Sequence, residues 1–77
     1  MKSLYFRSPS SQLFTYDLAT DKVQEQSFED VKEQIFDFLG IPVQEQALFY
    51  NGRLIHDISG LETLYSGSII DVNLRLQ

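Results

Sequence analysis

Residues that could carry out acid–base chemistry are few in this chain, and the clearest pair is His56 next to Asp57. A histidine oriented by a carboxylate can act as a general base. The chain has no cysteine to serve as a nucleophile, and its four glycines are isolated from one another, which argues against a phosphate-binding loop or an oxyanion hole. We therefore interpret His56 and Asp57 as a solvated turn and predict that the chain is not an enzyme.

Metal, cofactor and nucleic-acid sites are not expected either. A single histidine and the lack of cysteine exclude His-rich and thiolate metal sites. The carboxylate pairs Glu29/Asp30 and Glu33/Asp37 are interpreted as an acidic helix surface. Eleven acidic residues against six basic ones give a net charge of -5, whereas binding to a phosphate backbone needs clustered Lys and Arg. We predict no metal, no cofactor and no nucleic-acid binding.

Protein surfaces are the remaining source of function, and Phe49 is the first candidate. Strand alternation sends its neighbours Leu48 and Tyr50 into the core, so Phe49 should face outward. It would then either contact a partner or pack against Leu54 across a hairpin. Phe36, about 100° from the apolar stripe of a predicted helix, is either a shoulder of the core, which we favour, or a second contact point.

The C-terminal segment Leu74-Arg75-Leu76-Gln77 is a second candidate, because it is apolar and basic in an otherwise acidic chain. Once it leaves the sheet, such a segment is an extended peptide that a partner's groove can read. No run approaches the roughly 18 apolar residues of a membrane span. The 77 residues predict a single domain, 1–77, which we expect to be a soluble, intracellular monomer without membrane contact.

The elements that position these residues follow from local patterns. Alternating apolar residues on both sides of residues 8–11 predict a β-hairpin. A helix is predicted over about 27–39, with Ser27 as its N-cap and Gly40 at its end. Its apolar stripe comprises Phe28, Val31, Ile35, Phe38 and Leu39.

The second half of the chain predicts another hairpin, in which residues 47–50 pair with 53–55 across Asn51-Gly52. A short helical turn is expected around Leu61 and Leu64. A last strand over 68–76 would place Ile70, Val72 and Leu74 on one face. The predicted fold is α+β, with one helix across a mixed four- to five-stranded sheet, an arrangement that would bury each of these apolar stripes.

This order of elements, together with a set of residues spread along the chain, resembles ubiquitin and its β-grasp fold. The residues are Gly40-Ile41-Pro42, Gln46, Leu48-Phe49-Tyr50, Gly52, Asp57, Leu61 and Leu74-Arg75-Leu76. The resemblance implies that Phe49 replaces the central binding isoleucine of ubiquitin, in a protein-binding patch formed by Ala47, Phe49, Arg53, Leu54, Asp71 and Asn73. Asp71 and Asn73 replace a histidine and a valine, and Arg53 replaces the main chain-linking lysine. Ordinary ubiquitin receptors are therefore expected to bind poorly.

Four short motifs are similar to the N-terminal ubiquitin fold of the silencing-defective-two family of telomere-maintenance and replication-stress regulators. They are Arg7-Ser8-Pro9, Pro42-Val43, the run from Asn51 to Ile55, and Arg75-Leu76. In that family, deubiquitinating proteases cut after a Gly-Gly that follows the fold, and the released part joins the spliceosome. The resemblance implies the same proteases as partners, spliceosomal proteins as partners of the parent protein, and a nuclear and cytoplasmic location. Leu74 to Gln77 would be the tail that the protease reads. An uncleaved adaptor domain and a conjugated modifier stay open as alternatives.

Overall fold

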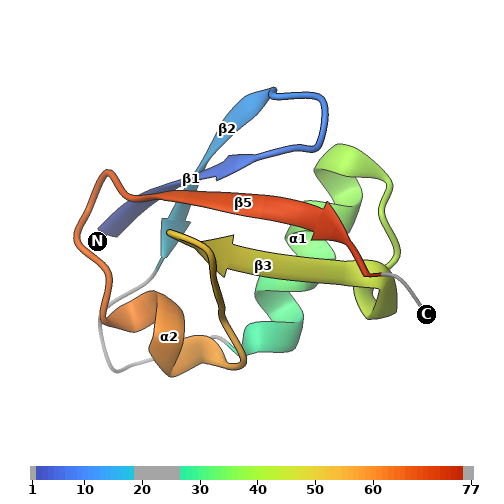
Figure 1. The fold of residues 1–77 in the computed structure, drawn as a ribbon. Helices are drawn as coiled ribbons and strands as arrows, with labels where there is room; N and C mark the ends of the chain where they lie inside the picture. Colours follow the sequence, from blue (N-terminus) through green and yellow to red (C-terminus); the bar gives the residue numbers. More distant parts are fainter. Residues whose placement is uncertain (1, 19–26, 76–77) are drawn as a thin grey trace.

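The chain folds as a five-stranded mixed sheet with one long helix packed across one face (Figure 1). The computed structural model describes residues 2–18 and 27–75. The strands lie in the order β2-β1-β5-β3-β4; β1 and β5 pair in parallel, and the other neighbours are antiparallel. The predicted α+β, β-grasp architecture is confirmed. The elements are β1 (Lys2–Arg7), β2 (Leu13–Leu18), α1 (Phe28–Leu39), η1 (Val43–Glu45), β3 (Gln46–Tyr50), β4 (Arg53–Leu54), α2 (Ile58–Glu62) and β5 (Ile69–Leu74).

The ends of α1 are set by local chemistry, as the sequence predicts. The Ser27 hydroxyl accepts a hydrogen bond from the Asp30 amide at 3.1 Å, and the Asp30 carboxylate accepts one from the Ser27 amide at 3.2 Å. This reciprocal capping box satisfies two amides that the helix itself leaves unpaired. Gly40 ends the helix at φ 76°, in the left-handed region that glycine enters at low cost.

The apolar stripe of α1 is only partly buried, so one sequence prediction is wrong. Val31 and Ile35 are fully buried, but Phe38 is 60% exposed. Its ring stacks on Phe14 of β2, with 4.8 Å between the ring centroids. Phe14 is itself only partly buried at the margin of the core, so stacking on it does not bury Phe38.

Phe36 is also exposed, to 46%, and is not among the residues that pack on the core. The preferred interpretation of Phe36 as a shoulder of the core is therefore wrong. Its side chain borders a shallow surface pocket together with Pro42 and Val43, just after the end of the helix. Phe36 is thus a surface residue available for contact.

The second hairpin turns as predicted, through Asn51 (φ 51°) and Gly52 (φ 79°), the pair of positive φ angles of a type I′ turn. The ladder of β4 covers two residues and is extended by a hydrogen bond from the Ile55 amide to the Leu48 carbonyl at 2.8 Å. The predicted helical turn is present as α2, with Leu61 fully buried.

The last strand, β5, is shorter than the predicted range 68–76. Ile70 and Val72 are fully buried at the centre of the sheet, whereas Leu74 is 55% exposed. Leu74 lies opposite Gln46 at the end of the ladder, where the core ends, so the prediction that it continues the buried face is wrong.

Candidate protein-binding face and tail

Phe49 is held on the sheet face away from α1 by the register of its neighbours. It lies opposite Asp71 of β5 and Leu54 of β4, and directly opposed residues project from the same face. Leu48, the next residue, is buried on the helix side with 1% exposure, so Phe49 projects to the outside as predicted. We call this face of the sheet the outer face.

Most of the predicted binding residues share the outer face. Ala47 lies opposite Asn73 in the same ladder and alternates in phase with Phe49. Phe49 and Ala47 are partly buried, while Leu54 is 41% exposed and Asn73 is exposed. The register thus brings together five of the six predicted residues: Ala47, Phe49, Leu54, Asp71 and Asn73.

Arg53 is the predicted residue that the structure places differently. It lies opposite Tyr50, whose ring packs against the core on the helix side. Because opposed residues share a face, the Arg53 side chain starts from the inner side of β4. It borders a separate shallow pocket with Tyr50, not the cluster around Phe49.

An ion pair at the centre of the outer face was not predicted from the sequence. The Arg7 Nε donates to a carboxylate oxygen of Asp71 at 2.6 Å, and the two side chains remain 46% and 37% exposed. The hydrogen bond and the negative charge of Asp71 raise the pKa of Arg7. The signal that could have revealed this pair is the parallel alignment of β1 with β5, which sets Arg7 opposite Asp71.

The tail leaves the body of the domain at a fixed point. The Arg75 amide donates to the Glu45 carbonyl at 2.6 Å, one residue beyond the end of β5. Leu74 and Arg75 are both exposed there. The other two predicted tail residues, Leu76 and Gln77, lie outside the described residues.

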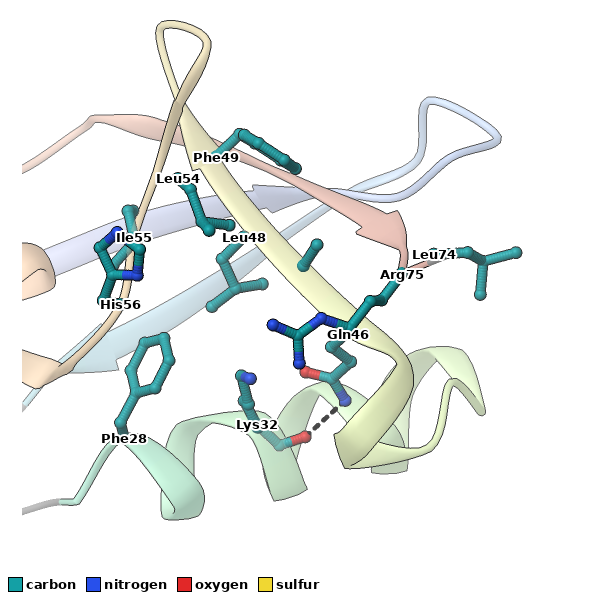
Figure 2. A pocket seen from close by; sticks show the side chains of 11 residues that line it. Phe28, Lys32, Gln46, Leu48, Phe49, Leu54, Ile55, His56, Leu74 and Arg75 are labelled. Carbon is teal, nitrogen blue, oxygen red and sulfur yellow. Dashed lines mark hydrogen bonds between the residues drawn. The ribbon is translucent and has the colours of Figure 1, made fainter. Parts of the chain in front are cut away.

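A groove lies beside β3, on the edge that β4 covers only in part, and has a volume of about 510 Å³ (Figure 2). Its floor contains Gln46, which is 1% exposed. The Gln46 Nε2 donates to the Lys32 carbonyl at 2.8 Å and to the Ile41 carbonyl at 2.9 Å. One buried amide thereby joins the helix, the segment after it and β3.

The cation of Lys32 also borders this groove. Its Nζ lies 5.0 Å from the ring centroid of Phe28, within the range of a cation–π contact. Partial burial lowers the pKa of Lys32 and the nearby charge of Arg75 lowers it further, whereas the charge of Glu29 raises it. Five of the residues predicted from the sequence line this groove: Ala47, Phe49, Leu54, Leu74 and Arg75. Sequence reasoning missed the groove itself because the rest of its lining comes from α1, the inner side of β3 and the segment after β4.

His56 and Asp57 do not form a catalytic arrangement. The Asp57 carboxylate caps α2, accepting hydrogen bonds from the Ser59 hydroxyl at 2.7 Å and the Gly60 amide at 3.2 Å. These two bonds, followed by the weaker effect of His56, lower the pKa of Asp57. The carboxylate that could have oriented the histidine is thus engaged in a helix cap.

The described residues contain neither a metal-binding cluster nor a membrane-spanning helix. Over residues 2–18 and 27–75, no three His, Cys, Asp or Glu side chains are grouped so that they could hold a metal ion. No helix in the same ranges is long and apolar enough to cross a bilayer.

The comparison with known families agrees with the fold. The model of the family described as "Ubiquitin family" matches residues 5–77. This chain belongs to the ubiquitin family. No curated protein matches the chain with significant similarity. Ubiquitin-family domains are typically modifiers or adaptors without enzymatic activity, and they commonly act by binding other proteins. The outer face of this ubiquitin-family domain and its tail are therefore its candidate site.

Proposed function

We propose that this ubiquitin-like domain is read by deubiquitinating proteases, which cleave it from a precursor. The observation that carries the proposal is the position of Phe49 on β3. Phe49 lies opposite Asp71 of β5, and β5 is the strand from which the tail departs. A protease that holds the outer face can thus take up the tail from the neighbouring strand.

Recognition is divided between the body and the tail. The partly buried Phe49 and the 41% exposed Leu54 supply an apolar centre for the protease to cover. Arg75 offers a guanidinium to acidic protease residues. Leu76 would fill the pocket four residues before the bond that is cut, if a Gly-Gly follows Gln77.

The resemblance to the silencing-defective-two family supports the further steps of the proposal. The part released from the precursor would act in pre-mRNA splicing and telomere maintenance, in the nucleus and cytoplasm. Spliceosomal proteins would be partners of that released part. An uncleaved adaptor would use the same Phe49 surface without a cut, and a modifier would end at the Gly-Gly. The sequence that follows Gln77 distinguishes these three functions.

The test is Leu76→Asp in the full-length precursor, expressed in cells and followed by intact mass or immunoblotting. A carboxylate in place of Leu76 is expected to abolish cleavage, because an apolar protease pocket would have to bury a charge. The matched control is Leu13→Asp, since Leu13 is 55% exposed on β2, at the far edge of the sheet. That variant should be cleaved normally, and normal cleavage of Leu76→Asp would refute the proposed function.

A further inference from the structure

The groove beside β3 differs in charge from the rest of the molecule. The chain carries a net charge of -5, yet the groove is bordered by Lys32, Arg75 and His56, and no Asp or Glu is among the residues that line it. Figure 2 shows the charged ends of Lys32 and Arg75 on the same side of the Gln46 amide. A positive groove on an acidic domain favours an acidic ligand.

The two cations are not neutralised within the part of the chain that the structure describes. Arg7 is held by Asp71 at 2.6 Å, but neither Lys32 nor Arg75 forms an ion pair in residues 2–18 and 27–75. Lys32 is in addition partly desolvated against Phe28. A carboxylate placed between the two cations would therefore meet charges that no ion pair already occupies, although the charge of Glu29 acts on Lys32 from a longer distance.

Gln46 places at the base of the groove an acceptor that is unpaired within the described part of the chain. Its amide nitrogen is fixed by two carbonyl acceptors, which also fixes the position of its oxygen. That Oε1 atom is buried and has no hydrogen-bond donor among the described residues. Leaving a buried acceptor unpaired costs about 1–3 kcal/mol. Because this oxygen is enclosed, a ligand in the groove reaches it only if the Gln46 side chain moves.

The walls of the groove decide which acidic ligand fits. Phe28, Leu48, Leu54 and Ile55 border it, so an occupant needs apolar side chains as well as a negative charge. Nucleic acid does not meet this requirement, and the net charge of -5 repels a polyanion. A small inorganic anion would leave the apolar walls uncovered. A peptide segment satisfies the charge and the apolar walls together.

We propose that the groove between α1 and β3 binds an acidic peptide segment of a partner protein, with one or more Asp or Glu residues flanked by aliphatic side chains. The carboxylate lies between Lys32 and Arg75, and the aliphatic side chains cover Phe28 and Leu54. The groove shares Leu54 and Arg75 with the surface proposed for protease recognition, but peptide binding is measured on the isolated chain and does not require that a protease cleaves the tail.

The experiment begins with selection of binders to the 77-residue chain from a random dodecapeptide library displayed on phage. The strongest peptide is then synthesised and titrated into the ¹⁵N-labelled chain. Selected peptides should carry Asp or Glu beside aliphatic residues, and the largest shift changes should fall on Lys32, Leu48 and His56. Failure to select any peptide, selection of peptides without acidic residues, or shift changes confined to other parts of the chain would overturn the proposal. A chain that responds only to inorganic phosphate at these residues would overturn it as well, in favour of a small-anion site.

Matched variants separate the groove from general electrostatics. Lys32→Gln is expected to weaken binding of the synthetic peptide about fivefold to tenfold, as expected for loss of one charge-assisted contact. Lys32→Arg should restore most of it. Arg53→Gln removes the same charge from a residue outside the groove lining and should change the dissociation constant by less than about twofold. The Lys32 carbonyl that binds Gln46 belongs to the backbone, so these variants keep that bond, and an unchanged amide spectrum checks the fold. Equal weakening by Lys32→Gln and Arg53→Gln would overturn the proposal.

Discussion

The two faces of the sheet differ in how far their side chains are buried, although their residues alternate along the same strands. On the inner face, Leu4, Phe6, Leu48, Ile70 and Val72 are no more than 1% exposed. On the outer face, Tyr5 is 37% and Ile69 is 41% exposed, and the only ion pair among the described residues crosses its centre. The inner face therefore stabilises the fold, and the outer face is free to be selected for binding.

The largest expected effect separates the two faces at adjacent residues of β1. Phe6 is fully buried and lies 5.6 Å from the Phe14 ring and 5.9 Å from the Tyr16 ring, measured between ring centroids. Phe6→Ala should lower the free energy of unfolding by about 3–5 kcal/mol through lost burial and a cavity. Tyr5→Ala, on the outer face, should cost less than about 1.5 kcal/mol. Urea denaturation of both variants measures the difference, and equal losses would contradict the division of the sheet.

Adjacent residues of β3 should differ in the opposite direction when function is measured, because the outer-face residue then has the larger effect. Phe49→Ala should slow processing of the full-length precursor about tenfold, as expected when a central interface side chain is truncated. It should destabilise the domain less than Leu48→Ala, for which about 2–5 kcal/mol is expected. Cleavage kinetics and urea denaturation are compared for the two variants. Unchanged kinetics for Phe49→Ala would remove this residue from the binding face.

A smaller effect is expected at the start of the helix that covers the inner face. Ser27→Ala removes the hydroxyl that accepts from the Asp30 amide and should cost about 1 kcal/mol in the free energy of unfolding. Ser27→Asp keeps an acceptor at the same position and is the matched control. A loss of the same size in both variants would show that the capping bond does not contribute.

The smallest effect concerns the Asp57 cap of α2 and depends on pH. The pKa of Asp57 is lowered in the folded chain from an ordinary value of 3.8, so the carboxylate stabilises the fold fully above that value. The contribution is lost as the pH falls through the lower, folded pKa. Asp57→Asn should therefore lower the melting temperature slightly at pH 6, and the difference from the unaltered chain should narrow below pH 3.8. Thermal melts at both pH values test this, and a difference that does not change with pH would contradict it.

The sequence predicts the features that depend on residues close together in the chain, such as helix caps and tight turns. Ser27 with Asp30, Gly40 after the helix and Asn51-Gly52 in the hairpin each carry their structural signal within a few residues, and all are confirmed. Alternation likewise places Phe49 on the outside correctly. These features could be predicted because their energies arise from short-range hydrogen bonds and backbone angles.

The features that the sequence does not predict depend on how elements distant in the chain are placed against one another. Phe38 has the correct helical spacing for burial, but its ring stacks on the partly exposed ring of Phe14 and stays 60% exposed. Arg7 meets Asp71 because β1 and β5 align in parallel, across 64 positions of the chain. The groove around Lys32 combines four segments in the same way. Such contacts follow from the three-dimensional register and are absent from any local pattern.

The parallel pairing of β1 with β5 has a consequence for synthesis of the chain. The first and last strands are neighbours at the centre of the sheet, so a nascent chain that lacks β5 lacks two of its buried residues, Ile70 and Val72. The hairpin and helix that emerge earlier from the ribosome have only part of their core available. The domain is therefore expected to fold late and in one cooperative step, after residue 74 has left the ribosome.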